Sequence, residues 1–204
     1  NITLVTPEQY ANAAITAGVT DAEIEVAAVS KVTGESALTG VYKAFEANGV
    51  QLDAKRTEVA QQELEVTNKI AQENANAKGF DSSKLDKAMI EIKKELAELK
   101  QKQGQLATKE DIERIINDAL KNNSLQNVIS KDQINALVAF AQNYQNTSAI
   151  DSKQVLEQLN SLSKSVGEKI NSLVEQAKNE GWLDKIAQFF TSIFESIKNL
   201  FNQQ

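Results

Sequence analysis

Side chains able to do chemistry are few in this sequence, because its 204 residues include neither histidine nor cysteine. The usual nucleophile–base triads, cysteine nucleophiles and His-bearing zinc sites are therefore excluded. Ser161 and Lys164 have the Ser-x-x-Lys spacing of penicillin-recognising serine enzymes, but no Ser-Asp-Asn motif accompanies them. They fall within a repeat of polar and apolar residues, which favours a solvated helix face. We predict no catalytic residue.

Acidic residues and glycines form three further patterns that could bind a ligand. Glu23 and Glu25 could do acid–base work or hold a hard cation, but an exposed strand face alternates in the same way, and we favour that interpretation. Residues 81–86 lack the glycine and terminal glutamate of a calcium loop. Gly34 and Gly40 lack the spacing of a phosphate-binding loop. We therefore predict no metal, cofactor or small-molecule substrate.

The composition narrows the choice of partners. The net charge is −6, with acidic and basic residues interspersed, and nucleic acid is a poor partner because phosphate contacts need a clustered cationic surface. No apolar run reaches the roughly 18 residues that cross a bilayer. A chain of this length can bury an ample core.

The last segment, residues 182–204, has the strongest amphipathic pattern in the chain. On a helix, its apolar residues fall within an arc of roughly 140°. Two destinations fit this pattern: packing against the preceding helix or a partner chain, and insertion at a membrane interface. Its charged residues cancel, and this lack of a cationic face favours packing. The candidate interaction residues are Trp182, Ile186, Phe189, Phe190, Ile193, Phe194, Ile197 and Phe201.

Residues 1–50 contain nearly all the β signal, and we predict a β-α-β-α unit there. The expected strands are residues 2–5 and 23–30. In the second of them, apolar residues alternate with polar ones. A helix is expected over residues 7–17, where Thr6 and Gln9 form a capping box and Pro7 takes the first helical position. A second helix follows Gly34. Two strands are too few to stand alone, and what completes the sheet stays open.

The rest of the chain is predicted to be helical. Five helices are expected: one over residues 53–77, one from residue 81 to a break at Gly104, one that starts at residue 108, one that starts at residue 130, and one over 151–178. Capping boxes mark the starts near residues 108 and 130. Their apolar residues recur every three or four positions, which suits helix-on-helix packing. The predicted fold class is α+β, mostly α, with an α/β unit at 1–50, a helical region at 51–178 and the amphipathic helix at 179–204.

Landmarks spread over most of the chain give a resemblance to a known family. They include Asn1-Ile2-Thr3, Tyr10, Thr16-Ala17-Gly18-Val19, Ala37-Leu38-Thr39-Gly40 and Gly181-Trp182. The sequence resembles the predicted secreted proteins of Gram-positive bacteria grouped as domain-of-unknown-function family 1002. A proline that usually precedes the second helix in that family is missing here, where Val29-Ser30-Lys31 stands. The resemblance implies secretion and a signal peptide and further segment ahead of Asn1, and it transfers no activity.

Together these features predict a non-catalytic, secreted or cell-envelope-associated structural or interaction protein of a Gram-positive bacterium. It would associate with another protein or with itself as an oligomer, through helical seams and an open sheet edge. The alternative is a peripheral membrane module that uses the amphipathic segment. A hydrolase with carboxylate or Ser–Lys chemistry ranks last.

Overall fold

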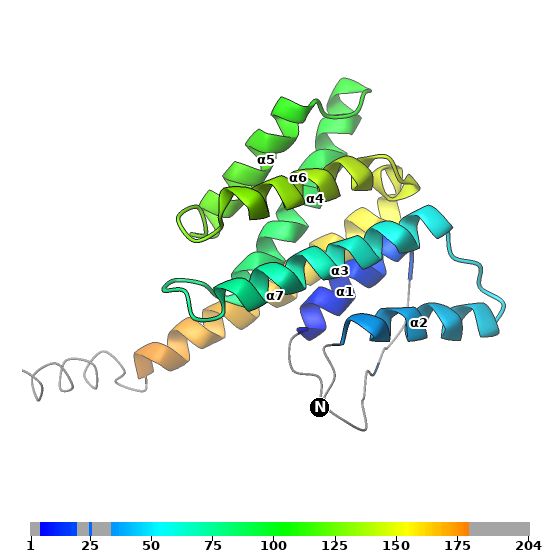
Figure 1. Cartoon of the computed structure of the whole chain (residues 1–204). Helices are drawn as coiled ribbons and strands as arrows, with labels where there is room; N and C mark the ends of the chain where they lie inside the picture. The colour runs from blue at the N-terminus through cyan, green and yellow to red at the C-terminus, as the bar shows by residue number, and fades with distance from the viewer. Residues whose placement is uncertain (1–4, 20–24, 26–33, 180–204) are drawn as a thin grey trace, which may run out of the picture. The chain divides into compact units, whose positions relative to one another are not determined.

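A computed structural model describes residues 5–19, 25 and 34–179, and every regular element within them is a helix. The elements are α1 (Pro7–Ala17), α2 (Glu35–Ala47), α3 (Ala54–Asn74), α4 (Ser82–Gln103), α5 (Lys109–Asn122), α6 (Lys131–Gln145), a short 3-10 helix η1 (Ser148–Asp151) and α7 (Lys153–Asn179). Figure 1 shows α3 crossing the middle, with α1 and α2 below it, α5 and α6 above it, and α4 rising from behind it.

The predicted α+β fold is wrong for the described part of the chain, which contains helices and no strand. The predicted strands fall mainly on residues 2–4, 23, 24 and 26–30, which lie outside the described residues. The two helices of the predicted β-α-β-α unit pack on another helix: α1 lies against α3, and α2 contacts α3 as well. A sheet edge is therefore not a route to assembly in the residues that the structure describes.

The predicted helix starts are confirmed, and local hydrogen bonds explain them. The Thr6 hydroxyl accepts from the Gln9 amide at 3.0 Å, and the Gln9 side chain accepts from the Thr6 amide, which satisfies two free donors at the start of α1. The capping boxes of α5 at Thr108 and of α6 at Ser130 form in the same way. The helix expected over residues 151–178 begins at Lys153, and the residues just before it form η1.

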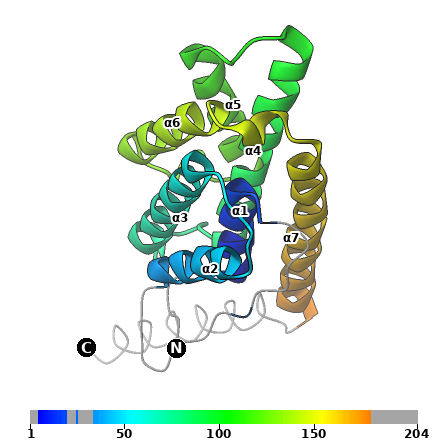
Figure 2. The ribbon, with the colours of Figure 1, turned by 90° about the vertical axis from the view of Figure 1, so that its right-hand side faces the viewer.

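A small apolar core joins the first three helices. Ala13, Ala17, Leu38 and Leu64 are buried there, and α2 adds partly buried side chains at its edge. Figure 2 shows α1 at the centre of this arrangement, surrounded by α2, α3 and α4. The helical body continues through contacts of α4 with α5, α5 with α6 and α3 with α6.

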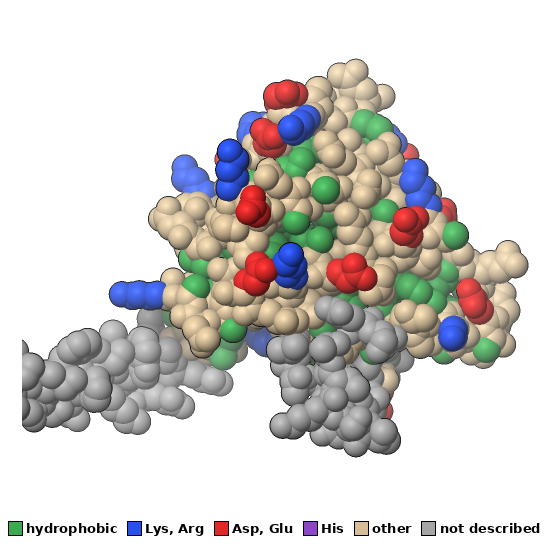
Figure 3. Space-filling view, viewed as in Figure 1, with side chains coloured by type: hydrophobic (Ala, Val, Ile, Leu, Met, Phe, Trp, Pro, Cys, Tyr) green, Lys and Arg blue, Asp and Glu red, His purple; other side chains and the backbone are tan. Residues whose placement is uncertain are grey.

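The chain forms two compact units, residues 1–166 and 167–204, and the packing above belongs to the first. The predicted division into residues 1–50, 51–178 and 179–204 stays a prediction. Acidic and basic side chains are interspersed on the face that Figure 3 shows, in keeping with the mixed charge of the sequence. None of the helices among the described residues has the length and apolar content needed to cross a membrane.

Candidate functional site

Residues singled out from the sequence do not come together in a site. The interaction candidates Trp182, Ile186, Phe189, Phe190, Ile193, Phe194, Ile197 and Phe201 all lie outside the described residues. Ser161 and Lys164 are exposed on α7, as expected for a solvated helix face. Glu25 is exposed and Glu23 lies outside the described part.

Instead, the structure brings together four polar residues where α1, α3 and α4 meet. This buried polar cluster consists of Asn12 and Thr16 on α1, Glu63 on α3 and Lys93 on α4, each 2% exposed or less. The Lys93 ammonium donates to Glu63 Oε1 at 2.8 Å, to Thr16 Oγ1 at 3.0 Å and to the Asn12 carbonyl at 3.0 Å. The Thr16 hydroxyl donates to Glu63 Oε2. All three Lys93 donors are therefore used within the core.

The surroundings of Lys93 are poor in water and rich in partners. Burial lowers the pKa of the Lys93 amine, and the carboxylate of Glu63 acts in the opposite direction, toward keeping the charge. The ring of Tyr144, from α6, lies 5.8 Å from the Lys93 nitrogen, within reach of a cation–π interaction. A buried ammonium is tolerated only when it is paired and fully hydrogen-bonded, and Lys93 meets both conditions.

Further charged groups hold the two ends of α1. Asp86 of α4 accepts a hydrogen bond from the Thr6 hydroxyl at 3.1 Å, at the start of α1. At its end, the Arg56 guanidinium of α3 donates to the Thr16 carbonyl at 2.8 Å and to the Ile15 carbonyl at 3.0 Å. A carboxylate thus lies at the positive end of the α1 dipole and the Arg56 guanidinium at its negative end, whereas Lys93 binds the Asn12 carbonyl in the middle of the helix.

The chemistry of this cluster points to structure. A threonine hydroxyl beside an amine has the parts of a nucleophile and its base. However, Thr16 and Lys93 are both 0% exposed, so a substrate has no path to the hydroxyl. The cluster instead fixes α1 against α3 and α4 through hydrogen bonds between defined side-chain and backbone atoms.

Sequence reasoning missed the cluster, although a signal was present. On α4 the buried Asp86 and Lys93 are seven residues apart, and each directly follows an apolar seam residue, Leu85 or Ile92. On α1, Asn12 and Thr16 are four residues apart, beside buried alanines. Polar residues at helical spacing next to a seam indicate a polar stripe inside the apolar face.

Replacing Tyr144 with phenylalanine is expected to leave the free energy of unfolding unchanged within about 0.5 kcal/mol, or to raise it. The hydroxyl is buried and has no hydrogen-bond partner among the described residues, so its removal relieves a desolvation cost. Burial and the nearby Glu63 also raise the pKa of Tyr144, which keeps the phenol neutral. Urea unfolding measures the difference.

The matched control is Tyr10→Phe, which removes a hydroxyl that donates to the Gly34 carbonyl. This variant is expected to lose about 0.5–1.5 kcal/mol. A loss of more than about 1 kcal/mol in Tyr144→Phe would show that the hydroxyl has a partner, and would contradict the prediction.

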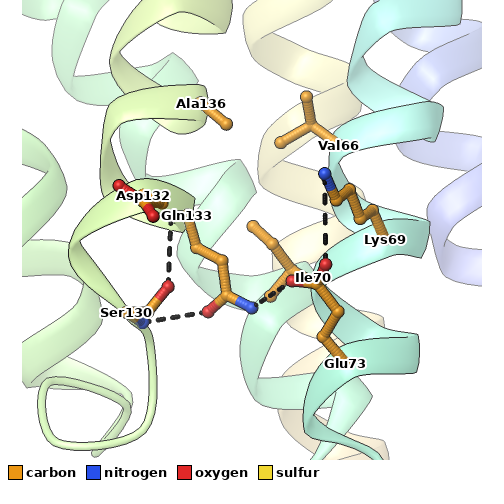
Figure 4. Close-up of a pocket in the computed structure, with 8 residues that line it drawn as sticks. All are labelled: Val66, Lys69, Ile70, Glu73, Ser130, Asp132, Gln133 and Ala136. Carbon is orange, nitrogen blue, oxygen red and sulfur yellow. Dashed lines mark hydrogen bonds and ion pairs between the residues drawn. The ribbon is translucent and has the colours of Figure 1, made fainter.

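A pocket of about 260 Å³ lies between α3 and α6. Figure 4 shows Val66, Ile70 and Ala136 around it, with Gln133 below. The Gln133 side chain accepts from the Ser130 amide at 2.9 Å and donates to Glu73 at 2.7 Å. The polar groups of Gln133 thus cap the start of α6 and join α6 to α3.

Comparison with known proteins gives a family and a relative from another bacterium. A family model described as "Protein of unknown function (DUF1002)" matches residues 1–162. The chain is 35% identical over 208 aligned residues to "Uncharacterized protein YpuA" of Bacillus subtilis (strain 168). The match covers 98% of this chain and 64% of that protein, so the chain spans less than two thirds of its relative. No solved structure matches.

Proposed function

This chain belongs to the DUF1002 family of proteins of unknown function, and on that premise we propose that it is a non-catalytic interaction protein that associates with itself through helical seams. The buried Glu63 and Lys93 side chains hold α1 against its neighbouring helices. This use of Glu63 and Lys93 supports a structural role for them. Neither the family description nor the name of the relative assigns an activity.

The observation that supports the proposal best is the apolar stripe of α7. Its first part is packed, with Val155, Leu159 and Val166 all 3% exposed or less. The same helix then continues into the second unit, where Leu173 and Val174 are 44% and 47% exposed. Exposing two adjacent large apolar side chains to water is unfavourable. An apolar helix face of this kind therefore favours association with another surface.

The occupant that we propose for this exposed seam is the seam of a second copy. Apolar residues at intervals of three and four are the pattern by which helices pair. A two-fold symmetric contact places the same patch of both copies face to face, so one exposed seam is enough to build it. The seam also continues an interface that the first unit already uses, through Val166 and the residues before it.

Sedimentation velocity of the full chain tests the proposal. The average mass is expected to rise with concentration, and the double variant Leu173→Asp/Val174→Asp should weaken self-association at least about tenfold, because charges cannot be buried in the seam. Asn171→Asp, at an exposed polar position on the same helix, is the matched control and should leave the strength of self-association unchanged. A monomer at every concentration, or equal association of the double variant, would overturn the proposal.

We further propose that the protein acts outside the cell or in the envelope of a Gram-positive bacterium. Support comes from the resemblance to predicted secreted proteins, and fractionation of cells that express the full gene product tests it. The membrane-interface alternative for residues 182–204 stays a prediction that competes with self-association. Binding to phospholipid vesicles that Trp182→Asp/Phe189→Asp abolishes would favour the membrane.

A further inference from the structure

The pocket between α3 and α6 lies between two hydrogen bonds that join these helices. The Gln133 side chain donates to Glu73 at 2.7 Å, and the Asn143 side chain donates to Gln62 at 2.9 Å. Most of the other lining residues fall between these two pairs in sequence. The walls of the pocket are therefore held in place by contacts within the chain, as in a preformed ligand site.

The inner surface of the pocket is apolar. Val66 and Ile70 of α3 and Ala136 of α6 surround it in Figure 4, and Ile70 is only 1% exposed. A hydrocarbon chain that lies on these side chains is removed from water, which favours binding. The volume of about 260 Å³ is below the roughly 300–1,000 Å³ of pockets for drug-sized ligands, so the ligand must be small.

The rim of the pocket carries more negative than positive charge. Glu73 and Asp132 bring two carboxylates to it and Lys69 brings one ammonium, and all three residues are exposed. Two negative charges against one positive charge leave the lining with a formal charge of −1. A site with this balance attracts a cation and repels an anion.

The two oxygens of Glu73 differ in how they are used. Oε2 accepts the hydrogen bond from Gln133, whereas Oε1 lies 4.0 Å from the Lys69 nitrogen, which is too long for a hydrogen bond. The Lys69 side chain is 75% exposed, and an exposed ion pair of this kind contributes little. Another ammonium group can therefore take the place of Lys69 beside Oε1.

We propose that this pocket binds a primary alkylammonium group, carried by a small free amine or by a lysine side chain of another protein. The hydrocarbon chain lies on Val66, Ile70 and Ala136, and the ammonium donates to Glu73 Oε1 with Asp132 as a second counter-charge. This binding is separate from self-association through α7, because the pocket is lined by α3 and by residues 130–136.

Titration of the ¹⁵N-labelled full chain with butylammonium chloride, followed by two-dimensional NMR, tests the proposal. We expect saturable shifts of the amide signals of Val66, Ile70, Gln133 and Ala136. Butanol has the chain without the charge and ammonium chloride has the charge without the chain, and each should bind at least about tenfold more weakly. No saturable shift with butylammonium, or equal binding of either control compound, would overturn the proposal.

Two variants remove the charge and the space separately. Glu73→Gln keeps an oxygen that can accept from Gln133 but removes the negative charge, and it should weaken butylammonium binding at least about tenfold. Ala136→Leu fills the pocket at constant charge and should abolish binding. The matched control is Glu65→Gln, an exposed carboxylate of α3 outside the lining, which should bind as the unchanged chain does. Unchanged binding in Glu73→Gln would contradict the assignment.

Lys69→Gln is expected to act in the opposite direction. Because this variant removes the cation that competes for Glu73, it should bind butylammonium more tightly than the unchanged chain. Weaker binding would mean that Lys69 helps to hold the ligand, and a cationic ligand would then be the wrong class.

A blocked lysine, Nα-acetyl-lysine methylamide, distinguishes the two sources of the ammonium group. It carries the same four-carbon chain as butylammonium, attached to a peptide backbone. Binding as tight as that of butylammonium assigns the pocket to a lysine side chain of a protein partner. Binding of butylammonium alone assigns it to free amines, because the backbone of the blocked lysine would then clash at the rim.

Discussion

Replacing Lys93 with methionine is expected to lower the free energy of unfolding by about 3–5 kcal/mol, although a charge is removed and an apolar chain of similar length is added. The reason is the group left behind. Glu63 is 1% exposed, and its side chain would lose the Lys93 ammonium and retain the Thr16 hydroxyl as its partner in the cluster. An uncompensated charge in the core costs several kcal/mol.

A double-mutant cycle separates the pair from its parts. Glu63→Met alone is expected to cost a similar amount, because it leaves the Lys93 ammonium without its counter-charge. Combining Lys93→Met with Glu63→Met removes both charges, and the loss should then be smaller than the sum of the single losses by about 2–3 kcal/mol. Urea unfolding of the four proteins gives the interaction energy.

An exposed ion pair provides the control. Lys102 and Glu98 are 3.7 Å apart on the same helix α4, with side chains 74% and 49% exposed. Lys102→Met should change the free energy of unfolding by no more than about 0.5 kcal/mol. If Lys93→Met were equally mild, water would have to reach the cluster, and the structural account of Glu63 and Lys93 would fail.

Local rules predicted the helices well because their determinants are local. The capping boxes at Thr6, Thr108 and Ser130 involve residues three apart in the chain, and all three form as expected. The stop of α1 at Gly18 follows from its left-handed backbone, with φ of 94°. The family was also predicted from residues spread along the chain, and the family model confirms it.

The predicted sheet shows where local rules end. An alternating run such as Ile24-Glu25-Val26 satisfies the strand pattern, but a strand needs partners that the pattern does not provide. The small face of α1, with Ala13 and Ala17, fits a sheet or another helix equally well. The choice of α3 as its neighbour depends on contacts between residues far apart in sequence.

The buried polar cluster was hidden for a related reason. Lysine and glutamate are seldom fully buried, so the sequence alone predicts that Lys93 lies on a solvated face of α4. Its partners Glu63 and Thr16 lie 30 and 77 residues away, and no spacing rule connects them. The interaction candidates between Trp182 and Phe201 lie outside the described residues and stay predictions.

Replacing Arg56 with alanine is the second variant from which we expect a large effect, a loss of about 3 kcal/mol in the free energy of unfolding. Its guanidinium donates two charged hydrogen bonds to carbonyls in the last turn of α1, and both acceptors would lose that partner. Hydrogen bonds from a charged donor contribute about 1.5–3 kcal/mol each. Urea unfolding measures the loss.

Two further variants show whether the fork geometry of Arg56 matters. Arg56→Lys keeps the charge but cannot bind two carbonyls with a rigid fork, so it should recover only part of the loss.

Gly18→Ala keeps the arginine at position 56. However, a Cβ at Gly18 would lie 3.1 Å from the guanidinium carbon and would also strain a backbone with φ of 94°. The guanidinium must therefore shift by a few tenths of an ångström, and Gly18→Ala combined with Arg56→Ala should lose less stability than the sum of the two single losses. Strict additivity would mean that Gly18 is needed for its backbone alone, and that the Arg56 clamp does not depend on the open space beside it.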